Sequence, residues 1–150
     1  MVTKMPSDAR TKINLGDVKS TGTMVGEVFI DNVYNHAFKA DLVNYVNNKV
    51  VIQIHGSQGD AQQSTTITVG LKPGTPSGSY EFGDPQITDL TYFPPREEAL
   101  WKVTGGGVNV TFNEAEYSVR GTLQVLATRA NQTLEANVGF HMRGCDADRG

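Results

Sequence analysis

Apolar and polar residues alternate along several stretches of the chain, and this alternation is its strongest structural signal. In residues 108–113, Val108, Val110 and Phe112 share one parity, and polar side chains occupy the other. A period of two predicts strands with one buried and one solvated face, as in antiparallel sheets. Residues of shared parity are expected to form one core: Ile52, Ile54, Ile67, Val69, Val110, Phe112, Leu123, Val125, Val138 and Phe140.

The clearest predicted strands lie in the second half of the chain. Short polar breaks at 113–116 and 129–132 divide residues 108–143 into three alternating segments. Such spacing predicts a three-stranded meander. Earlier strands are predicted at 49–56, at 64–71, near 23–31 and over 35–46, where Phe38 and Leu42 share a parity.

The middle of the chain, residues 72–107, is less regular. Short strands are expected at 80–82 and 87–93, and the prolines after Phe93 should end the second of them. The three glycines at 105–107 indicate a flexible turn before the meander. Helical spacing occurs only over 95–100, which is about one turn and too short to be stable alone.

These elements predict an all-β fold of roughly eight to ten strands. We expect a single-domain antiparallel β-sandwich, with a lipocalin-like β-barrel as the alternative, because alternation is the same in both. The chain has 150 residues, which suits one domain. Residues 1–10 and 144–150 are expected to be flexible tails.

Charge and hydropathy narrow the range of partners. The formal net charge is -3, and there is no run of lysine and arginine, so a nucleic-acid partner is not expected. No stretch approaches the roughly 18 apolar residues of a membrane span. The N-terminus also lacks the apolar segment of a secretory signal. The cytoplasm is therefore the default compartment, with secretion by another route left open.

Catalytic and metal-binding motifs are not found in the sequence. The three histidines do not have metal-ligand spacing, so we expect no metal and no cofactor. No serine lies in a GxSxG motif, and the Glu114 and Glu116 pair is interpreted as solvated loop charge. Cys145 is expected to be an incidental thiol in a frayed tail. Together these features favour a non-enzymatic protein.

Aromatic residues gather in the irregular stretch 79–101, and loops on a β-scaffold often carry binding function. Aromatic faces can stack on sugar rings or hold apolar ligands, while carboxylates supply directional hydrogen bonds. In the alternative interpretation, the same aromatic residues close one end of the core. The candidate ligand-binding residues are Tyr80, Tyr92, Phe93, Trp101 and Asp89.

The leading functional hypothesis is a non-enzymatic module that binds a carbohydrate or a small apolar ligand through residues near 80–101. The alternative is a protein–protein interaction or assembly module, such as an oligomer subunit, a toxin component or an inhibitor. That module would use an exposed strand edge or a threonine-rich face, and a homo-oligomer paired through strand edges is one form of it.

Overall fold

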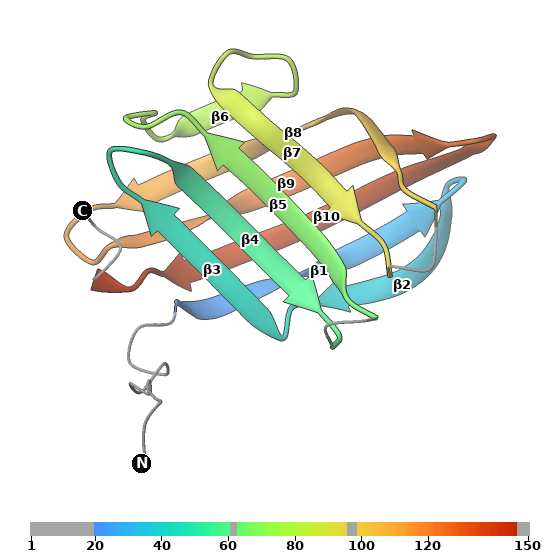
Figure 1. Ribbon diagram of the computed structural model, residues 1–150, viewed down its shortest axis with the longest axis horizontal. Helices are drawn as coiled ribbons and strands as arrows, with labels where there is room; N and C mark the ends of the chain where they lie inside the picture. Colours follow the sequence, from blue (N-terminus) through green and yellow to red (C-terminus); the bar gives the residue numbers. More distant parts are fainter. Residues whose placement is uncertain (1–19, 61–62, 96–98, 147–150) are drawn as a thin grey trace.

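The computed structural model describes residues 20–60, 63–95 and 99–146. Within these ranges ten strands form two sheets, and in Figure 1 the four-stranded sheet lies across the front of the six-stranded sheet. The six-stranded sheet, in the order β2-β1-β10-β9-β8-β6, contains β1 (Thr21–Ile30), β2 (Val33–Lys39), β6 (Gly78–Glu81), β8 (Lys102–Asn113), β9 (Ser118–Arg129) and β10 (Gln132–Arg143). The four-stranded sheet, in the order β3-β4-β5-β7, contains β3 (Leu42–Asn47), β4 (Ile52–Gln58), β5 (Thr65–Leu71) and β7 (Ile87–Phe93).

The architecture is an all-β antiparallel sandwich, which confirms the expected fold class. Every strand pair is antiparallel. The two sheets have separate strand orders that end at β2, β6, β3 and β7, so the described strands do not close into a barrel. Across the described ranges there is also no helix long and apolar enough to span a bilayer.

The core lies between the two sheets, and the expected set of core residues is confirmed. Nine of the ten residues are buried, with exposed fractions of 4% or less. The tenth, Phe112, is partly buried and packs against the same cluster. Shared parity identified these side chains correctly because one face of each strand is turned toward the other sheet.

The predicted meander is confirmed as β8, β9 and β10. The prediction of a flexible glycine turn before it is wrong. Gly105, Gly106 and Gly107 lie inside β8, which begins at Lys102. Gly106 has a φ of 108°, and a Cβ there would clash with the carbonyl oxygen of Gln124 in β9. These glycines therefore let two backbones approach closely instead of forming a loop.

The single strand expected over 35–46 is two strands that belong to different sheets. The N–H of Ala40 donates to the carbonyl of Met24 in β1 at 2.9 Å, and the N–H of Asp41 donates to the carbonyl of Ser57 in β4 at 2.8 Å. The chain therefore passes from one sheet to the other within one peptide. The shared parity of Phe38 and Leu42 is lost at this crossing: Phe38 is 1% exposed and Leu42 is 52% exposed.

The residues after β10 differ from the expected loose tail. Cys145 is 7% exposed, so it does not lie in a frayed tail as expected. Gly144 is also buried, and its N–H donates to the carbonyl of Tyr117 at 2.8 Å. Residues 1–10, residues 147–150 and residues 96–98 of the expected helical turn lie outside the described residues.

Candidate functional site

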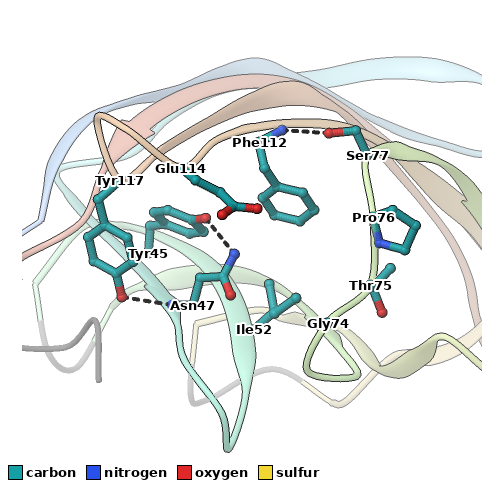
Figure 2. A pocket seen from close by; sticks show the side chains of 10 residues that line it. All are labelled: Tyr45, Asn47, Ile52, Gly74, Thr75, Pro76, Ser77, Phe112, Glu114 and Tyr117. Carbon is teal, nitrogen blue, oxygen red and sulfur yellow. Dashed lines mark hydrogen bonds between the residues drawn. The ribbon is translucent and has the colours of Figure 1, made fainter.

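A pocket of about 510 Å³ opens at one end of the sandwich, and we call it the end pocket. Its volume lies in the range of about 300–1,000 Å³ that is common for small-molecule sites. Figure 2 shows the side chains of Tyr45, Phe112, Glu114 and Pro76 around the same opening, with Ile52 below. The lining residues come from β3, β4, β8, the β8–β9 turn and the connection before β6.

Three aromatic rings form one wall of the end pocket. The rings of Tyr45 and Phe112 are stacked, with centroids 6.5 Å apart and an interplanar angle of 21°. The rings of Tyr45 and Tyr117 are 5.4 Å apart and tilted by 39°. Tyr45 and Tyr117 are buried, whereas Phe112 keeps part of its surface toward solvent. Phe112 is therefore the ring most available to a ligand.

Asn47 fixes both tyrosines of this wall. Its backbone N–H donates to the hydroxyl oxygen of Tyr117 at 2.9 Å, and its side-chain amide donates to the hydroxyl oxygen of Tyr45 at 2.9 Å. Both phenol groups thus have a partner despite burial, as buried polar groups require. The side-chain carbonyl oxygen of Asn47 remains as an acceptor at the pocket.

Tyr117 has an uncommon backbone conformation, with a φ of 52°. A bulky residue in this left-handed region costs about 1–2 kcal/mol relative to an ordinary conformation. The contacts of the ring with Tyr45 and the hydrogen bond from Asn47 offset that cost. Ala130 in the β9–β10 turn has the same φ of 52°, so this conformation follows from the hairpin turn that holds Tyr117.

The opposite wall is a turn that is attached to the six-stranded sheet. Residues 72–75 carry Pro-Gly in the middle, Gly74 has a φ of 82°, and the N–H of Thr75 donates to the carbonyl of Lys72 at 3.2 Å. These features are typical of a type II turn. The hydroxyl of Ser77 then accepts the N–H of Phe112 at 2.9 Å, so the turn and the aromatic wall are directly linked.

Tyr80, one of the residues predicted from the sequence, supports this wall from behind. Its hydroxyl donates to the carbonyl of Pro76 at 2.6 Å, and Pro76 lines the end pocket. Tyr80 does not line that pocket itself. It borders a separate depression on the outer face of the six-stranded sheet.

Among the described residues that line the end pocket, one side chain is charged, the exposed carboxylate of Glu114. Glu114 begins the β8–β9 turn, where its carbonyl accepts the N–H of Tyr117 at 3.2 Å. Figure 2 shows its carboxylate beside the Phe112 ring and directed toward the opening. A carboxylate accepts several hydrogen bonds at once, so the pocket joins an aromatic face to a strong acceptor.

Histidines do not contribute to the end pocket. His55 lies on the outer face of the four-stranded sheet, where Nδ1 is 2.8 Å from the hydroxyl of Thr68, and burial lowers the pKa of His55 from its usual 6.5. His36 lies beside Asn35, with 2.7 Å between Nδ1 and the side-chain oxygen. Among the described residues, no cluster of three His, Cys, Asp or Glu side chains could hold a metal ion.

The other four sequence-predicted residues are brought together elsewhere, in a groove of about 420 Å³ beside β7. We call it the β7 groove; Asp89, Tyr92, Phe93 and Trp101 all line it. Tyr92 and Trp101 are 4% and 8% exposed, whereas Phe93 is 47% exposed. The guanidinium of Arg129 covers the Trp101 ring at 4.1 Å from its centroid.

Sequence reasoning did not identify the end pocket. Tyr45 lies within a predicted strand, Phe112 counts as a core residue, and Glu114 is interpreted as loop charge. No local pattern connects these three positions, which the fold brings together from distant parts of the chain. The one available signal is the closeness of Phe112, Glu114 and Tyr117 around a single hairpin turn.

Comparisons with known proteins found no relative of this chain. No family model, no curated protein and no solved structure matches the chain. The candidate site therefore stands on the geometry of the chain's own residues.

Proposed function

We propose that the protein is a non-enzymatic module that binds a carbohydrate, with the end pocket as its binding site. The observation that carries the proposal is the partly exposed Phe112 ring beside the carboxylate of Glu114 and the side-chain amide of Asn47. A sugar presents an apolar C–H face and a rim of hydroxyls, so it needs an aromatic surface and polar groups together.

The polar rim favours a carbohydrate over a purely apolar ligand. Glu114 and the carbonyl oxygen of Asn47 are acceptors, and sugar hydroxyls are donors that match them. An apolar ligand would offer no donor to the carbonyl oxygen of Asn47, and an unsatisfied neutral group costs about 1–3 kcal/mol when it is buried. The pocket therefore suits a sugar better than a purely apolar ligand.

The same residues argue against hydrolysis of the bound sugar. Glycoside hydrolysis ordinarily uses two carboxyl groups on either side of the scissile bond. Within the part of the chain that the structure describes, Glu114 is the one carboxylate that lines the end pocket. A single acceptor can hold a hydroxyl, but it does not supply both an acid and a base or nucleophile.

A glycan array of neutral mono- and oligosaccharides, followed by calorimetric titration of each hit, tests the proposal. Phe112→Ala and Glu114→Gln should each weaken binding by tenfold or more, about 1.4 kcal/mol. Phe93→Ala is the matched control, because it removes an exposed aromatic ring from the β7 groove and leaves the end pocket intact.

Two results would overturn this proposal. The first is an array without any hit for the wild-type protein. The second is a hit that Phe112→Ala and Glu114→Gln, both folded by circular dichroism, bind as tightly as the wild type does. If Phe93→Ala alone lost binding, the site would be the β7 groove, as the sequence pattern suggested.

A further inference from the structure

A depression of about 660 Å³ lies on the outer face of the six-stranded sheet, and we call it the sheet-face depression. It runs from β6 across β8 and β9 to β10. Directly opposite residues of neighbouring strands point to the same face, so the register places two rows of residues across it. One row is Ser79, Asn109, Thr122 and Gly139, and the other is Glu81, Gly107, Gln124 and Asn137.

Gly139 is an unusual residue for the middle of β10. Glycine weakens a strand interior, and where it occurs it often marks a bulge, a bend, or the close approach of another backbone or of a ligand. The register on both sides of β10 is regular at Gly139, and its φ lies outside the left-handed region. A Cβ built on it would have its nearest neighbour 3.8 Å away. Neither the backbone nor the packing of the described residues therefore requires a glycine here.

The other described glycines of this sheet differ from Gly139, because contacts within the chain account for them. A Cβ would clash with the backbone of a neighbouring strand at five of these positions, namely Gly22, Gly26, Gly106, Gly107 and Gly121. At the remaining two, Gly78 and Gly105, it would have a side chain within 3.4 Å. Gly139 alone among them leaves open space above the sheet, and this space is one end of the sheet-face depression.

Three side-chain amides around this space are held in fixed orientations. The amide nitrogen of Asn109 donates to the hydroxyl of Ser79 at 2.8 Å. The amide nitrogens of Asn137 and Gln124 donate to the same carboxylate oxygen of Glu135, at 2.8 Å and 3.3 Å. Because each nitrogen is directed to its own acceptor, the three side-chain carbonyl oxygens remain as acceptors for a ligand.

These groups match an uncharged ligand that carries several hydroxyls. Amide oxygens accept hydrogen bonds, and the exposed hydroxyl of Thr122 both donates and accepts. An anion would find no counter-charge, since no Lys, Arg or His is among the described residues that line the depression. An apolar ligand would cover the amide oxygens without offering them a donor, which is costly. A neutral sugar meets these requirements, because its hydroxyls are donors that match the amide oxygens.

We propose that the sheet-face depression is a second carbohydrate site, which binds a neutral oligosaccharide across β8, β9 and β10 with one sugar unit over Gly139. The one aromatic residue among the described residues that line it, Tyr80, packs against the core. Stacking therefore adds little, and we expect a dissociation constant on the order of 1 mM. This inference goes beyond the proposed function and does not depend on it, because the two sites share no lining residue.

NMR titration of the isotope-labelled full chain with cellotetraose, maltotetraose and mannotetraose, each to about 20 mM, tests the site at concentrations that nearly saturate it. Signals of Asn109, Gln124 and Gly139 should shift with at least one of the three sugars. Gly139→Val fills the open space with a side chain that strands favour, so this variant should keep its stability and bind at least tenfold more weakly. Gln124→Leu, which removes an amide acceptor, should also weaken binding. Thr133→Val is the matched control, because Thr133 is exposed on β10 and lies outside the depression.

The same spectra report the two sites separately, since shifts of Asn47 and Ser77 belong to the end pocket. Absence of shifts at Asn109, Gln124 and Gly139 with all three sugars overturns the second site, whatever happens at the end pocket. A folded Gly139→Val protein that binds as tightly as the Thr133→Val control also overturns it. So does a Gly139→Val protein less stable than that control, because packing would then account for the glycine.

Discussion

Gly144 packs directly against Tyr117: a Cβ built on Gly144 would lie 2.5 Å from Cε2 of the tyrosine ring. Its N–H also donates to the carbonyl of Tyr117 at 2.8 Å. The residue that follows the last strand therefore supports the aromatic wall of the end pocket from the outside. In the sequence, nothing distinguishes Gly144 from a glycine in an ordinary chain end.

Replacement of this glycine should destabilise the protein. The Cβ of Gly144→Ala would also lie 2.8 Å from the backbone carbonyl oxygen of Tyr45, which cannot move independently of β3. We expect a loss of about 1–3 kcal/mol in the free energy of unfolding, as for other overpacked sites, measured by urea denaturation. Gly139→Ala is the control, because its nearest neighbour lies 3.8 Å away. Equal stabilities of the two variants would contradict the contact.

Trp101 is expected to act mainly as a structural plug. It is 8% exposed, and Arg129 covers its ring. Trp101→Ala should cost about 3–5 kcal/mol of unfolding free energy, as truncation of a large core aromatic does. Phe93→Ala, in the same groove but 47% exposed, should change it by less than about 0.5 kcal/mol. A Trp101→Ala protein as stable as the wild type would favour a ligand-binding role for this ring.

His55 should make stability depend on pH in the mildly acidic range. Burial lowers the pKa of His55 in the folded protein below its usual 6.5, so the unfolded chain binds a proton more readily. Stability contributed by the neutral ring is then fully present above pH 6.5 and is lost as the pH falls below that value. In thermal melts from pH 7.5 to 5, His55→Gln should show a shallower loss of stability. An unchanged slope would contradict the assignment.

The strand pattern could be predicted from the sequence because alternation is a local property. Ile67 and Val69, for example, are buried because their own strand presents that face to the other sheet. The exceptions come from tertiary structure. Gly106 is a strand residue because β8 and β9 approach closely there, and Leu42 is exposed because the chain changes sheets two residues earlier.

The candidate site could be predicted only in part, for the same reason. Four of the five candidate residues from the aromatic stretch 79–101 line one groove together, namely Asp89, Tyr92, Phe93 and Trp101, and a ligand-binding role for them stays a prediction. Burial of Tyr92 and Trp101, however, depends on neighbours such as Arg129 that are distant in sequence. The end pocket depends on distant partners entirely, because Asn47, Pro76 and Phe112 have no shared pattern.

The central claim is that a carbohydrate binds in the end pocket. The most direct measurement is an amide and aromatic NMR titration of the isotope-labelled protein with the best neutral oligosaccharide from the array. The account predicts that signals of Asn47, Ser77, Phe112 and Glu114 shift progressively, while the Trp101 indole and the β7 amides stay unchanged. Shifts confined to Trp101, Tyr92 and Phe93, or no shifts at saturating sugar, would contradict it.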